Sequence, residues 1–215
     1  KYVVLIRHPI ATSVSYANSF FDGNFELAHQ YNPILARYVP AIASFLRQKE
    51  VPFIHVRYED LVREPEKWVR EICSYLGIPY ESEMINYGKI TPANRKRRGL
   101  GDPIAVEAHL RPTAASLTKW AEELAADPAK LDFMRQMINQ LDPEDLRTLG
   151  YPLEELWCPF EELKGQPFRP QKLPLTAYRV QRKLIISLRQ IAQKKRLFYR
   201  ALKRLQLTCE VLLRE

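Results

Sequence analysis

Cysteine, histidine, methionine and glycine are scarce in this chain of 215 residues, which has three cysteines, four histidines, three methionines and seven glycines. The cysteines lie far apart without the paired spacing of a zinc site, and an odd number argues against a disulfide framework. The histidines are equally scattered, so the sequence predicts no metal centre. Free thiols are typical of a reducing compartment, which favours a cytoplasmic protein. The residues concerned are Cys73, Cys158 and Cys209, and His8, His29, His55 and His109.

Long apolar runs are also absent, since none reaches the roughly 18 residues that a membrane-spanning helix needs. With 46% hydrophobic and 27% charged residues, the composition is typical of a soluble globular protein. The chain has no initiating methionine and opens on Lys1, directly beside the apolar run 2–6. Because proteins rarely begin at the edge of a core strand, we expect this end to be a cut edge.

The positive charge is concentrated at one end of the chain. Residues 176–215 hold eleven basic and two acidic side chains, a net of +9, so the preceding 175 residues carry −1 of the total +8. Apolar residues from Leu184 to Leu212 alternate at steps of four and three, interrupted by Lys195, which predicts one amphipathic coiled-coil helix. Such a helix could dock on its own protein or form a homodimer, lie on an anionic membrane surface, or contact nucleic acid. We rank these in that order, with nucleic acid last because the body is not basic.

Over the first half of the chain, short runs of β-branched and aromatic residues, typical of strands, alternate with segments whose apolar residues have the spacing of a helix. Residues 2–6 and 51–58 read as strands, the first of them buried, with helices expected at about 10–20 and 33–49 between them. Pro65 predicts the start of a helix that ends near Leu76, with Gly77 as its C-cap. Helices are also expected at 115–125, 128–141 and 143–149, and a long loop at 91–112. This order predicts a β-α-β crossover and therefore an α/β fold with a parallel sheet.

Three motifs lie where ligands bind in parallel sheets. Arg7 follows the first strand, with Ser15 on the next helix, and a guanidinium beside a helix N-terminus suits an anion. Tyr58 follows the second strand, where a nucleotide base could sit, and Asp60 could cap the following helix. The segment 94–102 joins four cations to two glycines, which can wrap a phosphate. Taken singly, the arginine is more often a structural pairing residue and the basic run more often a solvated loop, and a capping role for Asp60 is a reasonable alternative at the second motif.

Together and in this order, the motifs resemble those of sulfotransferases that use 3′-phosphoadenosine 5′-phosphosulfate (PAPS), over about residues 1–152. Val4-Leu5-Ile6-Arg7-His8-Pro9 with Ser15 is similar to the family's 3′-phosphate segment. Arg57-Tyr58-Glu59-Asp60-Leu61 and Arg97-Arg98-Gly99-Leu100-Gly101-Asp102 are similar to its later blocks. Ser116-Leu117 with Trp120, and Leu149-Gly150-Tyr151, fit bacterial members. The late loop is one residue shorter than the family's, and Pro103 stands where many members have tryptophan.

The resemblance implies transfer of a sulfuryl group from PAPS to a hydroxyl or amine. Arg7 and Ser15 would hold the 3′-phosphate, Tyr58 would contact the adenine side, and Arg97, Arg98 and Gly99 would close over the phosphates. It implies a partial P-loop-type three-layer fold at 1–152, the C-terminal portion of the domain. The prolines and the apolar periodicity themselves predict a Pro-rich connector at 153–175 and a helical extension at 176–215. The 5′-phosphosulfate loop and the catalytic base are expected upstream of Lys1, so residues 1–215 alone are expected to be inactive.

The acceptor is left open among a small molecule, a glycan and a carrier-tethered hydroxyl. The Gly-Leu-Gly-Asp-Pro segment and His109 are similar to sulfotransferases of bacterial polyketide or peptide assembly lines, which implies the last of these. A different class of function also stands: a non-catalytic nucleotide-fold remnant whose basic helix mediates dimerisation or binding to an anionic surface. That alternative predicts no upstream phosphosulfate loop, and a location peripheral to the membrane would be compatible with it.

Overall fold

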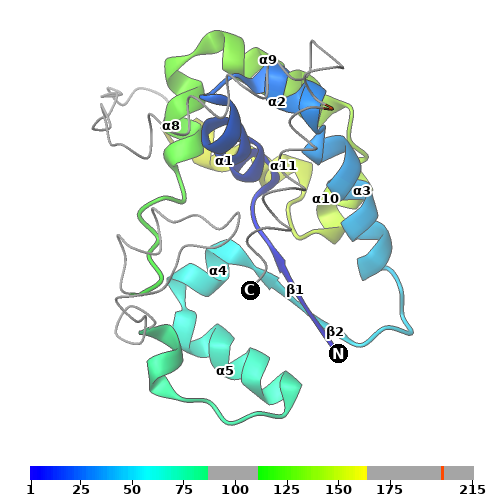
Figure 1. The fold of residues 1–215 in the computed structure, drawn as a ribbon, viewed down its shortest axis with the longest axis vertical. Helices are drawn as coiled ribbons and strands as arrows, with labels where there is room; N and C mark the ends of the chain where they lie inside the picture. The colour runs from blue at the N-terminus through cyan, green and yellow to red at the C-terminus, as the bar shows by residue number, and fades with distance from the viewer. Residues whose placement is uncertain (87–110, 164–199, 201–215) are drawn as a thin grey trace. The chain divides into compact units, whose positions relative to one another are not determined.

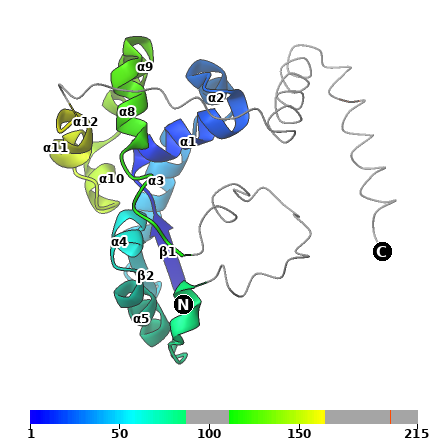
Figure 2. The same cartoon turned by 90° about the vertical axis from the view of Figure 1, so that its left-hand side faces the viewer.

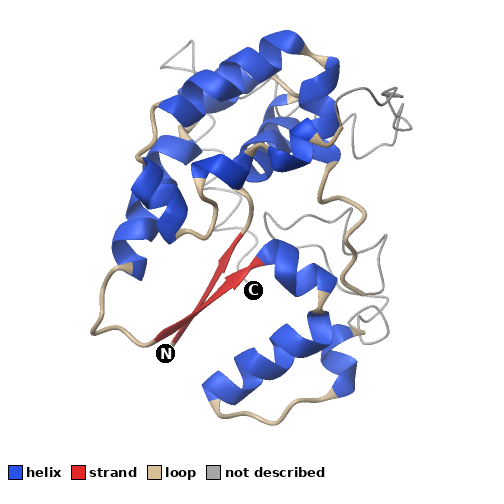
Figure 3. Cartoon of the chain, turned by 180° about the vertical axis from the view of Figure 1, so that it is seen from behind, coloured by secondary structure: helices blue, strands red, loops and turns tan. Residues whose placement is uncertain are grey.

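The computed structural model describes residues 1–86, 111–163 and 200, and within them the chain is a mixed α/β protein. Strands β1 (Tyr2–Ile6) and β2 (Phe53–Arg57) pair in parallel, from Tyr2 opposite Phe53 to Ile6 opposite Arg57 (Figure 3). Between them in sequence lie α1 (Pro9–Phe21), α2 (Phe25–Tyr31) and α3 (Ile34–Leu46). The predicted α/β class with a parallel sheet is therefore confirmed.

Helices cover both faces of the strand pair. Phe45 of α3 lies 5.5 Å from the ring of Tyr2 and 5.8 Å from that of Phe53, so α3 covers the face that these two residues share. Val56 points to the opposite face because side chains alternate along a strand, and it is fully buried. After β2 come α4 (Tyr58–Arg63) and α5 (Pro65–Leu76), which both contact β2 (Figure 1). The sheet is the middle layer of three.

A group of helices lies beyond the carboxyl ends of the strands (Figure 2). Asp127 caps the second of them by accepting hydrogen bonds from the backbone N–H groups of Ala129 and Lys130, and Asp142 caps the third in the same way through Glu144. These side chains satisfy backbone donors that a helix start leaves free. The group comprises α8 (Lys119–Ala126), α9 (Pro128–Asn139), α10 (Pro143–Thr148), α11 (Leu153–Leu156) and α12 (Cys158–Glu161).

The chain divides into two compact units, one of residues 1–15 and 32–168 and the other of residues 16–31 and 169–215. The strands and the described helices α3, α4, α5 and α8 to α12 belong to the first unit. In the described part of the second unit, aromatic rings gather at the end of α1 and on α2. Phe21 lies 5.4 Å from Tyr16 and 5.5 Å from Tyr31.

Local signals placed most element ends correctly. α5 begins at Pro65 and ends at Leu76, and its C-cap is Gly77, whose φ of +80° is the left-handed conformation that glycine tolerates best. Helix α3 ends at Leu46 rather than Lys49, and α8 begins at Lys119 rather than Ala115. The sequence analysis did not predict α2. Helices α11 and α12 occupy the first part of the segment expected to be a connector.

The expectation that the first strand is buried is wrong in this structure. Tyr2, Val3 and Leu5 are 55%, 41% and 51% exposed, and of β1 only Ile6 is buried. The physical reason is that β1 has one strand neighbour, β2, among the described residues, which leaves its other edge unpaired. The calls on the loop 91–112, apart from its last two residues, and on the helix 176–215, apart from residue 200, lie outside the described residues. No helix in the described ranges has the length and apolarity to cross a membrane.

Gly150 lies in the turn after α10 and sets the direction in which the chain continues to Tyr151. Its φ is +81°, its N–H donates to the carbonyl of Arg147 (3.0 Å), and the N–H of Tyr151 donates to that of Leu146 (2.9 Å). This is a Schellman motif, which turns the chain sharply after the helix. A Cβ at Gly150 would lie 3.3 Å from Cδ of Arg57, so the turn is also tightly packed against β2.

We predict that Gly150→Ala destabilises the fold more than Gly77→Ala does. Both glycines have a left-handed backbone, which costs a residue with a Cβ about 1–2 kcal/mol. Only Gly150 adds a close contact, because nothing lies within 4 Å of a Cβ at Gly77. Urea denaturation of the two variants measures the difference in the free energy of unfolding. Equal losses would contradict the tight packing of the Gly150 turn.

Candidate functional site

Two of the predicted site residues meet at the carboxyl ends of the strands. Arg7 follows β1 directly, and Tyr58 is the first residue of α4 after β2. The guanidinium carbon of Arg7 lies 5.1 Å from the centre of the Tyr58 ring, a cation–π contact. They come together because parallel strands end at the same edge of a sheet.

The other predicted residues are less directly placed. Ser15 lies on α1, two turns beyond Arg7, and is half-buried. Arg97, Arg98 and Gly99 lie outside the described residues. Asp60 does not cap α5, as the sequence allowed: it lies in the first turn of α4 and pairs with Arg57 (3.8 Å) and Arg63 (4.0 Å).

Arg7 has an unbalanced positive charge within the described residues. No carboxylate there lies within ion-pair distance of it, and its buried Nε has no hydrogen-bond partner. The first turn of α1, which begins two residues later, contains no acidic side chain. The positive end of the helix therefore reinforces the guanidinium, and both favour an anion.

A buried carboxylate lies directly behind this pair. Glu59 is only 7% exposed, and its Oε1 accepts a hydrogen bond from the backbone N–H of His8 (3.0 Å). Its Oε2 accepts one from the hydroxyl of Tyr151, which also lies 3.0 Å from the carbonyl oxygen of Ile6. The end of β1, the start of α4 and the turn after α10 thus meet at one carboxylate.

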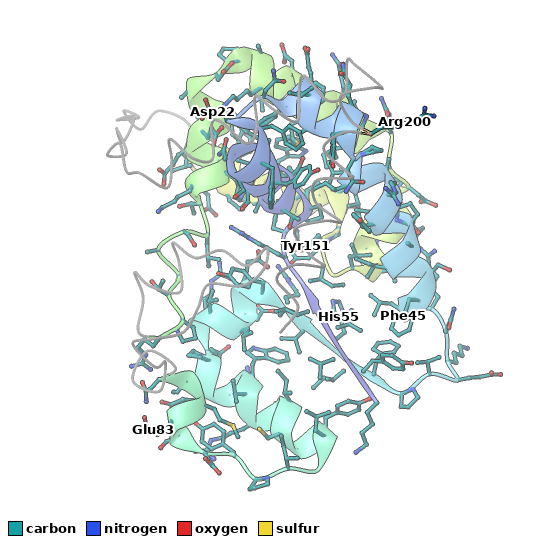
Figure 4. The ribbon with its side chains drawn as sticks, viewed as in Figure 1. Asp22, Phe45, His55, Glu83, Tyr151 and Arg200 are labelled. Atoms are coloured by element: carbon teal, nitrogen blue, oxygen red, sulfur yellow. The ribbon has the colours of Figure 1, made fainter. Side chains whose placement is uncertain are left out.

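Tyr151 is held as a neutral donor at this point. The Schellman turn at Gly150 directs it to the strand ends (Figure 4), where the guanidinium carbon of Arg57 lies 4.6 Å from its ring centre. Burial and the hydrogen bond to Glu59 raise the pKa of the Tyr151 phenol. The hydroxyl therefore keeps its hydrogen at all ordinary pH values and can donate to the carboxylate.

His8 is buried on the other side of the turn from Arg7. Its Nε2 lies 3.0 Å from the carbonyl oxygen of Leu156, so that nitrogen carries the hydrogen, and its ring stacks on Trp120 at 4.7 Å. Burial lowers its pKa to about 4, outweighing the nearby charge of Glu59. This neutral imidazole donates its one N–H to Leu156 and packs its ring on Trp120, which is a packing role.

A cavity of about 280 Å³ opens beside this network. Its wall includes His8 and Glu59, but neither Arg7 nor Tyr58, so it adjoins the predicted anion site without coinciding with it. The other lining residues bring two cations, two hydroxyls and aromatic rings: Arg57, Arg63, Leu117, Thr118, Trp120, Gly150, Tyr151, Glu155, Leu156, Cys158 and Pro159.

The sequence analysis missed the roles of His8, Glu59 and Tyr151. All three stood inside quoted motifs, but their burial depends on contacts between segments 51 to 148 residues apart in the chain. The local signal was an acidic residue close to the end of a strand, and such a residue is more often exposed. Among the described residues, no group of three or more His, Cys, Asp or Glu side chains could hold a metal ion.

Comparison with known proteins gives one family and one structure. A sequence model described as the sulfotransferase family matches residues 1–82, which contain Arg7, Ser15 and Tyr58. Over this segment the match agrees with the resemblance to sulfotransferases that the sequence motifs showed. Among solved structures, the chain is similar to a sulfotransferase domain from the curacin biosynthetic pathway, with 22% identity and a TM-score of 0.43. The match covers 71% of this chain and 54% of that one, so the chain spans about half of that domain's length. No curated protein matches the chain.

We predict that the protein loses stability as the pH falls from 6.5 towards 4, in part through His8. The folded-state pKa of His8 is about 4 against 6.5 for a free side chain, so in this window the unfolded state binds one proton more. The free energy of unfolding should fall by up to about 1.4 kcal/mol per pH unit from this residue. Denaturant titrations of the wild type and His8→Gln at pH 7 and 4.5 measure it. An unchanged pH dependence in the variant would contradict the burial of a neutral His8.

Proposed function

We propose that the protein transfers a sulfuryl group from PAPS to a hydroxyl or amine, starting from the match of residues 1–82 to a model of the sulfotransferase family. The observation that carries the proposal is the position of Arg7. Its guanidinium has no carboxylate partner among the described residues, it packs on Tyr58, and it stands at the carboxyl ends of two parallel strands.

Arg7 is suited to the 3′-phosphate that distinguishes PAPS from other adenine nucleotides. A guanidinium offers a planar fork of N–H donors that can pair with two phosphate oxygens. The start of α1 adds backbone donors and partial positive charge on the same side. Ser15 would supply a hydroxyl to the same phosphate, as in the family.

Tyr58 would take the adenine side of the nucleotide. Its ring already carries the Arg7 guanidinium on one face, so a base placed beside it would have its phosphate within reach of the same cation. Arg97, Arg98 and Gly99 would close over the phosphates, a role that rests on their similarity to the family's late loop.

The reaction breaks the bond between sulfur and the 5′-phosphate oxygen of PAPS and forms one between sulfur and the acceptor oxygen or nitrogen. Adenosine 3′,5′-bisphosphate (PAP) leaves, and the acceptor proton passes to a base. Cations around the phosphates would stabilise the negative charge that develops on the leaving group. We assign no described residue as the base. The acceptor remains a small molecule, a glycan or a carrier-tethered group.

Three further predictions rest on the sequence alone. They are the cytoplasmic location, the bacterial type of the enzyme, and dimerisation or membrane-surface binding through 176–215. The alternative of a non-catalytic remnant also stays a hypothesis, because its basic helix lies almost wholly outside the described residues.

We predict that Arg7→Ala weakens binding of PAP to the full-length protein at least about tenfold, the effect of losing one charge-assisted contact. Ser15→Ala should weaken it less, because a hydroxyl is a neutral donor. Isothermal titration calorimetry measures both. Arg70→Ala is the matched control, since it also removes an arginine stacked on a tyrosine ring, at 3.9 Å from Tyr80, on α5.

PAP binding that survives Arg7→Ala unchanged would contradict the proposed function. So would an equal loss in Arg7→Ala and Arg70→Ala, because a general loss of positive charge would then explain both.

A further inference from the structure

The backbone on both sides of Arg7 is tied to one pair of buried side chains. The residue before it, Ile6, has its carbonyl oxygen 3.0 Å from the hydroxyl of Tyr151. The residue after it, His8, donates its N–H to Glu59 at 3.0 Å. Tyr151 and Glu59 are themselves hydrogen-bonded to each other. Arg7 therefore projects from a turn whose two ends both contact the same pair, with the one hydroxyl hydrogen of Tyr151 directed at Glu59 and the Ile6 carbonyl beside it.

The pair of Glu59 and Tyr151 also holds the position of Tyr58, on which Arg7 packs. Glu59 follows Tyr58 directly in α4, so the bond from His8 to Glu59 joins the two positions next to the stacked residues Arg7 and Tyr58. A movement of Glu59 would shift the guanidinium and the ring relative to each other. Because Tyr151 comes from the rigid turn after α10, the junction is anchored to a third segment.

We propose that Glu59 and Tyr151 are positioning residues that set the protein's preference for a 3′-phosphorylated adenine nucleotide, by holding the Arg7 turn against the Tyr58 turn. The inference rests on the proposed function. Both side chains are buried, Glu59 at 7% and Tyr151 at 3% exposure, so they act through Arg7 rather than on the nucleotide. Pre-organised donors bind more tightly because less ordering accompanies binding.

A purely structural role makes a different prediction. If the pair only stabilised the fold, its loss would weaken the binding of every adenine nucleotide alike or lower the melting temperature without changing selectivity. If it positions Arg7, its loss affects the 3′-phosphate contact alone. The ratio of affinities for PAP and for AMP, which lacks that phosphate, separates the two.

The test uses Tyr151→Phe in the full-length protein, which removes the hydroxyl and keeps the ring between His8 and Arg57. Calorimetric titration should show PAP binding weakened about tenfold and AMP binding nearly unchanged. The double variant Arg7→Ala/Tyr151→Phe should bind PAP no more weakly than Arg7→Ala alone, because both changes remove one contact.

Tyr75→Phe is the matched control. It removes a buried tyrosine hydroxyl that has no hydrogen-bond partner among the described residues and lies on α5, and it should leave both affinities unchanged. Glu59→Leu, which removes both acceptor oxygens at a similar side-chain size, gives the same comparison if Tyr151→Phe does not fold.

Equal weakening of PAP and AMP, or additive losses in the double variant, would overturn the positioning role while leaving the proposed function intact. A wild type that binds PAP no better than AMP, or that binds PAP equally well after Arg7→Ala, would overturn the proposed function and this inference with it. The two failures are therefore distinguishable in one set of titrations.

Discussion

A single buried carboxylate, that of Glu59, holds together the part of the structure on which function depends. Burying a charge is costly unless hydrogen bonds replace the lost water, and breaking one partner leaves the charge uncompensated. Glu59 meets this requirement with donors from two distant segments, the backbone of His8 and the hydroxyl of Tyr151. The ends of β1, β2 and α10 must therefore meet at one place for the carboxylate to be tolerated. The arrangement of the strand ends follows from that constraint.

Because of the same constraint, the neighbouring residues Arg7 and His8 lie in different surroundings. Arg7 goes towards Tyr58 with its charge unbalanced among the described residues, whereas His8 goes into a stack with Trp120 and stays neutral. One side can accept an anion, and the other is packed core beside a cavity. A short turn thus serves both binding and folding. Gly150 supports it from the turn after α10, where the backbone is left-handed and a Cβ would lie 3.3 Å from Cδ of Arg57.

Sequence reasoning succeeded where local rules decide the outcome. Apolar β-branched runs gave both strands, Pro65 and Gly77 marked the ends of α5, and the β-α-β order gave a parallel sheet. The meeting of Arg7 and Tyr58 also followed, because parallel strands place their carboxyl ends together. It failed where contacts between distant segments decide. The exposure of Leu5 depends on which strands are its neighbours, and the burial of Glu59 depends on a tyrosine 92 residues away.

The most direct measurement of the central claim is a crystal structure of the full-length protein with PAP bound. The account predicts that the 3′-phosphate lies within hydrogen-bond distance of the Arg7 guanidinium, with the adenine next to Tyr58 and the Glu59–Tyr151 bond intact behind them. A 3′-phosphate bound elsewhere, with Arg7 still resting on Tyr58 and facing no anion, would contradict it.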